Sequence, residues 1–255
     1  MATIGTLRIY LTGEVQAELG DRLLRESKLG GPQGRFVLAY LITERKRAVA
    51  QSELAEALWS GSPPSSWTLA LSAIVSKLRS RLGALGLDRT RIIGHAFGCY
   101  QFTAPAGTWI DVEAALAAVD AAEGALIAGS PGSAYGSSLI ATTVLRRPFL
   151  AGDESAWADR RRAELASVLV RALDCRVEAL LANAEFELAL THAREAVALE
   201  PYRESGYRRL MRVHRGMGDR AQAVRVYGEL RALLERELGV QPSQETEDVY
   251  REIAG

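Results

Sequence analysis

Several kinds of residue are scarce in this chain of 255 residues, and each scarcity excludes a class of protein or site. The two cysteines, Cys99 and Cys175, lie far apart without metal-ligand or CxxC spacing, so we expect packing residues rather than a disulfide, redox or zinc site. No apolar stretch approaches the roughly 20 residues that a membrane span needs, and no N-terminal signal pattern appears. We therefore expect a cytoplasmic protein with no membrane partner.

Catalytic motifs are missing as well. The chain has no phosphate-binding glycine loop, no nucleophile elbow and no HExxH. Its three histidines, His95, His192 and His214, do not have the spacing of a metal or acid–base cluster. The sequence therefore predicts a protein that is not an enzyme and that has no catalytic residue, no metal site and no cofactor.

Charge is unevenly distributed along a chain whose formal net charge is zero. Residues 1–103 hold 13 Lys and Arg against 8 Asp and Glu, whereas residues 104–255 hold 18 against 23. A positive segment attracts a polyanion and a negative one does not. If the chain binds nucleic acid, we expect contact through the first segment only.

The first segment has the order of elements of a winged helix-turn-helix. Turn signals and alternation over residues 6–25 predict three or four short antiparallel strands. The elements expected next are a helix around residues 36–41, a short helix over 52–59, a proline stop at 63–64, a helix over 65–82 and a β-hairpin over 91–102. Ser65 or Ser66 can cap the third helix through its side chain. In such a module one helix enters the major groove while the hairpin, the wing, lies against the adjacent backbone.

The helix over 65–82 is the candidate reading helix. At 100° per residue its apolar stripe is Leu71, Val75, Leu78 and Leu82, with Ile74 on the edge, and this stripe must face a core. The opposite side carries short side chains, which allow the backbone to approach a groove floor, and cations flank it. An ordinary surface helix with solvated cations is the alternative interpretation. The predicted DNA-binding residues are Thr68, Ser72 and Ser76 for base edges, Lys77, Arg79 and Arg81 for phosphates, and Arg91 and His95 in the hairpin.

Beyond Thr103 the strand signals end, and residues 104–107 are typical of a short linker. From Asp111 the pattern is a series of amphipathic helices, broken by the Gly/Ser/Pro stretch 129–138 and by Arg147-Pro148. Segments beginning at 184 and 218 resemble each other at a distance of 34 residues, the period of tetratricopeptide repeats, with Ala189 and Ala223 at the position where helices approach closely. An irregular helical bundle is the alternative.

Several motifs in order resemble the antibiotic regulatory protein (SARP) family over nearly the whole chain. They are LGGPQ at 29–33, EALW at 56–59, PP at 63–64, VSKLR at 75–79 and ELGVQPS at 237–243. Members join an OmpR-type winged helix to a bacterial transcriptional activation domain. The resemblance implies an α+β winged helix-turn-helix at 1–103, followed by an all-α, tetratricopeptide-like repeat domain at 110–255.

The resemblance also implies a function. It implies a transcriptional activator that binds direct repeats in double-stranded DNA, usually as a homodimer, and recruits RNA polymerase to a biosynthetic or pathway-specific promoter. By the same resemblance, the loop containing Trp59, Ser62 and Ser65 faces the polymerase. An unknown small-molecule or protein effector is compatible with this scheme.

The chain departs from the family pattern at the predicted interface. Thr68 and Leu69 stand where members commonly carry Arg and Asn, and the hairpin run at 94–100 has no arginine between its strands. His95 is the candidate there for a minor-groove or phosphate contact, and a simple polar surface residue is the alternative. The run Arg45–Arg47 is either a further contact to phosphate or polymerase, or a solvated loop. Because of these departures, a second function remains an alternative to the activator. It is a repeat-based protein-binding adaptor or small-molecule sensor with a weakened DNA-binding domain.

Overall fold

The computed structural model describes residues 5–255, and their contacts divide the chain into two compact units. The first unit comprises residues 5–114 and 147–163, and the helical unit comprises residues 115–146 and 164–255. Helices α4 (Asp111–Ile127) and α6 (Ala156–Ala182) each give their first residues to the first unit and the remainder to the helical unit. The domain bounds of 1–103 and 110–255 stay a prediction, of which residues 1–4 lie outside the described residues.

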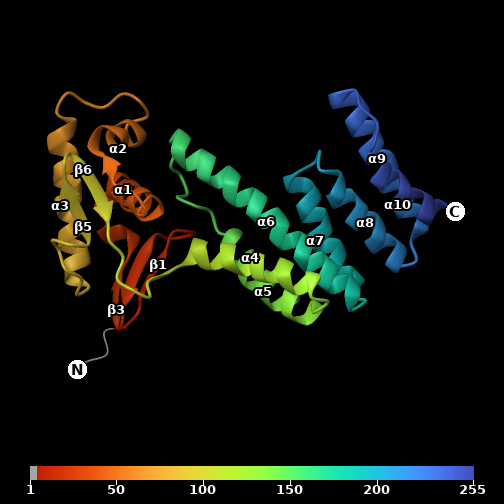
Figure 1. Ribbon diagram of the computed structural model, residues 1–255. Coiled ribbons are helices and arrows are strands. Elements are labelled where there is room, and N and C mark those ends of the chain that lie inside the picture. Colours follow the sequence, from red (N-terminus) through yellow and green to blue (C-terminus); the bar gives the residue numbers. More distant parts are fainter. Residues whose placement is uncertain (1–4) are drawn as a thin grey trace. The chain divides into compact units, whose positions relative to one another are not determined.

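A four-stranded sheet opens the first unit (Figure 1). Its strands, in the order β3-β2-β1-β7, are β1 (Leu7–Tyr10), β2 (Gln16–Leu19), β3 (Arg22–Leu24) and β7 (Trp109–Ile110). The first three are antiparallel neighbours, as the alternation predicts. The prediction that strands end at Thr103 is wrong, because β7 pairs parallel with β1, Trp109 lying opposite Arg8. Two residues are too few for a periodic pattern to reveal such a strand.

A buried carboxylate ties the start of α4 to the end of β1. Asp111 has no exposed surface, and its side chain accepts hydrogen bonds from the backbone N–H of Leu11 (2.9 Å), Thr12 (3.0 Å) and Val112 (2.8 Å). It also accepts one from the Thr12 hydroxyl at 2.7 Å. Four donors satisfy a charge that would be costly to bury alone. The bonds to Leu11 and Thr12 hold segments about a hundred residues apart.

Three helices follow the sheet: α1 (Gly31–Thr43), α2 (Gln51–Leu58) and α3 (Trp67–Ala84), with a 3₁₀ turn η1 (Glu26–Lys28) before them. The three helices predicted from apolar spacing are therefore confirmed. Helix α1 is central, since all its residues from Phe36 to Ile42 are buried. A Cβ at Gly34 would lie 1.9 Å from the carbonyl oxygen of Leu29, so only glycine permits this close passage of the chain.

A second, three-stranded sheet has the order β4-β6-β5, with β4 (Val49–Ala50), β5 (Ile93–Ala96) and β6 (Cys99–Phe102). Strands β5 and β6 form the predicted hairpin, although β5 begins at Ile93 rather than Arg91. Figure 1 shows this hairpin beside α3. The predicted side-chain cap of α3 is wrong: Ser66 is the N-cap residue but makes no side-chain cap bond, and its carbonyl accepts from Leu69 and Ala70 instead.

The segment 147–163 packs within the first unit. Phe149 forms a β-bridge with Thr12. The buried Trp157 packs on two aromatic rings, and its ring centre lies 5.3 Å from that of Phe36 and 4.7 Å from that of Tyr40. The side chain of Arg162 in α6 donates to the carbonyl of Phe149 at 3.0 Å. Contacts of this kind are why these residues group with the sheet rather than with the helices that flank them in sequence.

The helical unit is built from α4, α5 (Pro131–Leu145), α6, α7 (Phe186–Leu199), α8 (Glu204–Gly216), α9 (Arg220–Leu238) and α10 (Gln244–Ala254). The break expected over 129–138 is too long, because α5 starts at Pro131, where proline suits the first turn of a helix. Helices α7 and α9 begin 34 residues apart, and Ala189 and Ala223 are fully buried, as the repeat predicts.

Helices α7, α8 and α9 pack in sequence order around one apolar core, to which α10 adds Ile253 (Figure 1). This core includes the large side chains Tyr207, Met211 and Leu230. Stacked helix pairs of this kind are what a repeat of helical hairpins produces. Over residues 5–255, no helix has both the length and the apolarity that crossing a membrane requires.

Candidate nucleic-acid interface

Helix α3 buries the stripe that its sequence predicts. Leu71, Val75, Leu78 and Leu82 are all buried and Ile74 is half-buried. Beside this stripe runs a row of three residues spaced four apart, Thr68, Ser72 and Ser76, and each of them is exposed. The helix therefore presents a row of short hydroxyl side chains to solvent.

Two cations lie on the other flank of α3. Lys77 and Arg81 are four residues apart and exposed, so they lie on the same side of α3. Within residues 5–255, no carboxylate forms an ion pair with either of them, whereas most arginines of the chain are paired. Their charge is available to an external anion.

Arg79 is used inside the protein instead. Its Nε and Nη2 donate to the carbonyl oxygen of Ile93 at 2.9 and 2.6 Å, and its guanidinium carbon lies 5.9 Å from the centre of the Tyr100 ring. A half-buried guanidinium with these partners links α3 to the hairpin. The three cations that the sequence groups together thus separate into two free ones and one structural one.

The two hairpin candidates have different surroundings. Arg91 precedes β5, and its side chain is 86% exposed and 3.5 Å from the carboxylate of Asp88. His95 lies on β5, and the side-chain amide of Gln51 is 2.6 Å from its Nε2. This contact links the hairpin to the first residue of α2. Sequence reasoning missed Gln51, since nothing in its local pattern shows that the start of α2 meets the wing.

The loop between α2 and α3 contains the three predicted polymerase-facing residues. Ser62 and Ser65 are exposed and Trp59 is half-buried at the end of α2. The loop turns through two positive φ angles, 51° at Ser60 and 81° at Gly61. A hydrogen bond from Gly61 N to Glu56 O, 2.8 Å long, holds this turn against α2.

The basic run after α1 is engaged within the first unit. The guanidinium of Arg45 pairs with the carboxylate of Glu113, with one N···O distance of 2.7 Å. Arg47 binds Glu53 at 2.5 and 2.9 Å, and this contact, followed by the hydrogen bond from Tyr40, holds the pKa of Glu53 below its usual value despite partial burial. Two of the three cations are therefore paired with carboxylates of the first unit.

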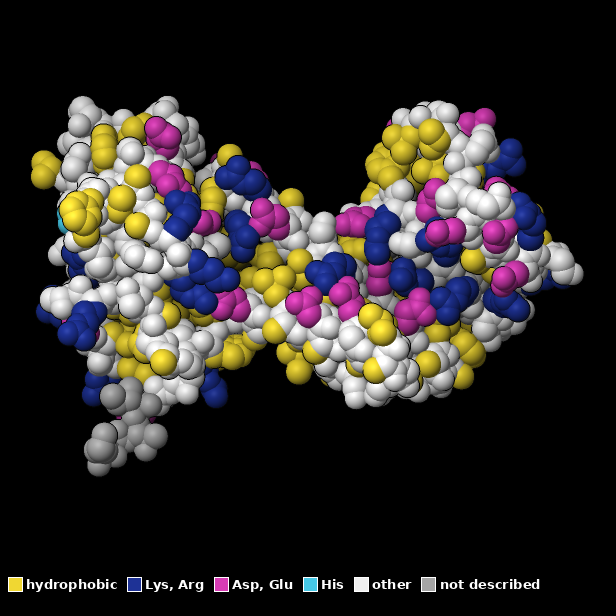
Figure 2. All heavy atoms as spheres, viewed as in Figure 1, with side chains coloured by type: hydrophobic (Ala, Val, Ile, Leu, Met, Phe, Trp, Pro, Cys, Tyr) yellow, Lys and Arg dark blue, Asp and Glu magenta, His cyan; other side chains and the backbone are white. Residues whose placement is uncertain are grey.

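Charges of the helical unit neutralise one another. Arg209 and Arg212 share the carboxylate of Glu178, at 3.0 and 2.9 Å, and Arg171 binds Glu123 at 2.7 Å. On the face shown in Figure 2, the Lys/Arg and Asp/Glu side chains of this unit, on the right, are intermixed. On this face, the side chains of the unit form no large patch of one sign.

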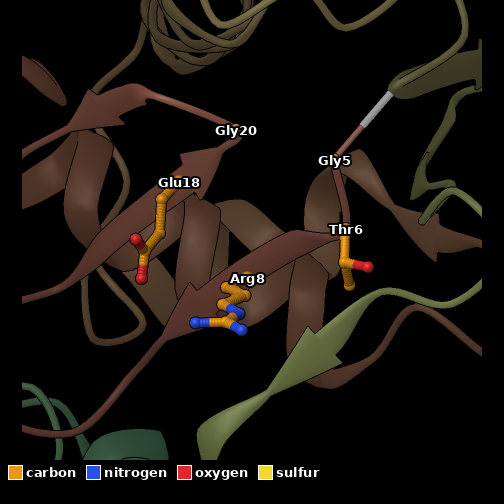
Figure 3. A pocket seen from close by; sticks show the side chains of 5 residues that line it. All are labelled: Gly5, Thr6, Arg8, Glu18 and Gly20. Atoms are coloured by element: carbon orange, nitrogen blue, oxygen red, sulfur yellow. The ribbon is translucent and has the colours of Figure 1, made fainter. Parts of the chain in front are cut away.

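A shallow hollow of about 280 Å³ lies on the four-stranded sheet (Figure 3). Gly5, Thr6, Arg8, Glu18 and Gly20 line it. Arg8 and Glu18 are opposite each other on β1 and β2, and Figure 3 shows both side chains on the same side of the sheet. Its few lining groups and open shape do not form a catalytic or cofactor constellation. Among residues 5–255, no group of three or more His, Cys, Asp or Glu side chains is placed to hold a metal ion.

Comparison with known proteins assigns the chain. Residues 110–254 match the family described as "Bacterial transcriptional activator domain". Regulatory protein AfsR of Streptomyces coelicolor is 29% identical over 98% of this chain, which covers 24% of that relative. Transcriptional regulatory protein MoaR1 of Mycobacterium tuberculosis is 26% identical over 98% of the chain and 80% of the relative.

A solved structure agrees with these relatives. The chain superposes on Mycobacterium tuberculosis EmbR, solved in complex with a low affinity phosphopeptide, with a TM-score of 0.87 at 25% identity. The match covers 97% of this chain and 65% of that one. The chain thus spans about a quarter of the AfsR relative and about two thirds of the EmbR chain. It belongs to the SARP-type transcriptional regulators that carry a bacterial transcriptional activator domain.

Proposed function

We propose that this regulator is a sequence-specific DNA-binding activator whose residues up to 103 act as a winged helix-turn-helix. Helix α3 would be the reading helix and the β5–β6 hairpin the wing. The observation that carries the proposal is the exposed row of hydroxyl side chains on α3, together with the unpaired cations Lys77 and Arg81 on the other flank of the helix. Small side chains allow close approach to base edges, and free cations neutralise phosphates.

Each candidate residue takes a role that its surroundings permit. Thr68, Ser72 and Ser76 would contact base edges in the major groove, and Lys77 and Arg81, which share one flank of α3, would contact phosphates on one side of it. Arg91 would reach a phosphate by leaving its weak, exposed pairing with Asp88. Arg79 would act indirectly by holding the wing at a fixed place beside α3.

The helical unit would serve protein contacts rather than DNA. Its stacked helices support a tetratricopeptide-like repeat, and its internally paired charges support a surface that does not attract phosphates. By resemblance to the family, we further propose that the loop at Trp59, Ser62 and Ser65 recruits RNA polymerase, that the protein forms a homodimer, and that an unknown small-molecule or protein effector regulates it. A regulator of this kind would act in the cytoplasm, where the bacterial chromosome lies.

The adaptor or sensor reading is the less favoured alternative. It requires a DNA-binding segment that has lost its contacts, whereas α3 retains two free cations and an exposed polar face. The relatives are named as regulators, which also favours the activator.

The experiment is fluorescence-anisotropy binding of the full chain to DNA from upstream of its own gene, over a salt series, with random DNA as control. We expect tight binding to one fragment, weakening as salt rises. The K77A/R81A variant should lower affinity on every sequence and reduce the slope of log K against log salt by about 2, because two phosphate contacts are lost.

A matched variant separates interface charge from general charge. R236A removes an exposed arginine of α9 whose side chain reaches only the neighbouring Glu237, and it should leave DNA binding unchanged. Equal affinity for all fragments, with no effect of K77A/R81A, would contradict the activator and direct attention to a protein or small-molecule partner of the helical unit.

A further inference from the structure

The most exposed large apolar side chain in the described part of the chain is at the tip of the hairpin. Phe97 is 104% exposed, compared with 90% for Ile127 and 75% for Leu69. Full exposure of a phenyl ring leaves apolar surface in water, which costs about 25 cal/mol per Å² relative to burial. Scattered exposed apolar residues are ordinary, so the ring alone indicates no partner.

The backbone at Phe97 makes this residue an unusual choice. Ala96 and Cys99 are paired, so Phe97 and Gly98 form a two-residue turn, and their φ angles are both positive, 50° and 71°. Such turns favour Asn-Gly or Gly-Gly, and a bulky residue with positive φ is sterically disfavoured. Neither the stability of the turn nor the burial of the side chain accounts for phenylalanine here.

The turn is held firmly, so the ring is displayed from a rigid support. The carbonyl of Gly98 accepts from the backbone N–H of Gln51 at 2.9 Å, and the side chain of Gln51 bonds His95. The carbonyl of Phe97 itself accepts a weak bond from the Cys99 thiol, with a sulfur–oxygen distance of 3.7 Å. Pairing of β4 with β6 completes the support.

The hairpin that carries this tip is joined to α3, the helix that carries the free cations. Arg79 joins α3 to the first residue of β5 through two hydrogen bonds. Lys77 and Arg81 on that helix attract a polyanion. Phe97 cannot bind a phosphate, and the part of a duplex that an apolar side chain can engage is the stack of base pairs. The minor groove, about 6 Å wide, admits such a side chain but not a helix.

We propose that Phe97 is an apolar wedge that enters the minor groove of double-stranded DNA and partly unstacks one base step next to the site read by α3. The proposal rests on the proposed function and deepens it, since it assigns the tip of the wing a contact without charge. Apolar wedges at minor-groove steps kink the duplex, and pyrimidine–purine steps yield most easily. A wedge of this kind gives the protein a preference for binding sites that contain a deformable base step. It takes the place of the phosphate or groove contact that an arginine in the wing would make.

The experiment uses duplexes that the full chain enriches from a random-sequence library, with 2-aminopurine placed in turn at each adenine position across the enriched site. We expect binding to raise 2-aminopurine fluorescence at one step, which reports unstacking. F97A and F97N should abolish that rise and weaken binding about tenfold, while the salt slope stays as in the wild type because no charge is removed.

F97N controls for folding. Asparagine suits the turn, so its melting temperature should equal or exceed that of the wild type even as DNA binding falls. I127A, which truncates another exposed apolar residue, should change neither affinity nor fluorescence.

The outcomes distinguish the two proposals. Suppose that K77A/R81A weakens binding but that F97A and F97N bind as tightly as the wild type, or that no base step unstacks. The wedge proposal is then overturned, while the proposal of a DNA-binding activator stands. The apolar tip would in that case be a candidate contact for a protein partner. If no duplex is enriched, both proposals fail together.

Discussion

Arg79 and Ile93 are joined by two hydrogen bonds from one guanidinium to one main-chain carbonyl, and this link connects the candidate reading helix to the candidate wing. Its consequence is that a cation in the middle of a basic run serves the fold rather than a ligand. Substitutions in this run therefore test different properties. Replacing Lys77 or Arg81 tests DNA binding, whereas replacing Arg79 first tests the stability of the fold.

Replacement of Arg79 should destabilise the first unit. R79A leaves the Ile93 carbonyl without its charged donor and removes packing on Tyr100, so we expect the free energy of unfolding to fall by about 1.5–3 kcal/mol. R79K, which cannot make both bonds at once, should lie in between. Urea titration measures both, and S80A, an exposed neighbour, is the control. If R79A unfolds at the same urea concentration as the wild type, the Arg79–Ile93 hydrogen bonds are not needed for stability.

Loss of the Asp111 carboxylate should be more severe. D111A leaves the amides of Leu11 and Thr12 and the Thr12 hydroxyl without their acceptor in a fully buried site, so we expect a loss of about 3 kcal/mol or more. T12V removes one of these bonds and should cost about 1 kcal/mol. Thermal and urea unfolding give the comparison. Similar effects for the two variants would contradict the role of Asp111 as a shared acceptor.

Stability of the helical unit should fall as pH is lowered below about 6.5, the ordinary pKa of histidine. Burial, followed by the positive charges of Arg176 and Arg146, lowers the pKa of His192 in the folded protein, although Glu195 opposes this effect. The unfolded chain then binds a proton before the folded chain does, so protonation favours unfolding. Burial and Arg194 lower the pKa of His214 in the same way.

Urea unfolding between pH 7.5 and 5.5 measures this dependence. The window lies above the pH at which carboxylates such as Glu195, whose pKa is lowered by Arg146, lose their charge. H192Q should flatten the pH dependence, and H192Q/H214Q should flatten it further. An unchanged slope in the double variant would place the titrating group elsewhere.

The two thiols should differ in reactivity. Burial, with the nearby charges of Glu123 and Asp174, raises the pKa of Cys175 to about 11, so little reactive thiolate forms at pH 8. Cys99 is only half-buried on β6. Iodoacetamide should label one thiol rapidly in the native protein and the second only on unfolding. C99S should abolish the rapid phase, and retention of that phase would assign it to Cys175.

Local pattern was sufficient for much of the fold. The apolar stripe of α3, with Leu71 and Val75, and the 34-residue spacing that places Ala189 and Ala223 in equivalent buried sites are periodic features, and each needs only its own helix to be recognised. The hairpin followed from turn residues and alternation in the same way.

Long-range pairing was beyond the reach of such patterns. Strand β7 forms because it pairs with β1, which lies about a hundred residues earlier in the chain. Two residues are too few to show the alternation of apolar and polar side chains that marks a strand. The grouping of residues 147–163 with the sheet likewise depends on Trp157 meeting Phe36 and Tyr40.

The sequence by itself determined which residues form helices, which faces are apolar, and which short motifs the chain shares with its family. Only the tertiary structure decided that Arg79 is bound internally while Lys77 and Arg81 stay free, and that Phe97 stands fully exposed on a pinned turn. The physical reason is that periodicity reports how a segment contacts a core, whereas the partner of a charge or a ring is a group far away in the chain, brought near only when the whole unit folds.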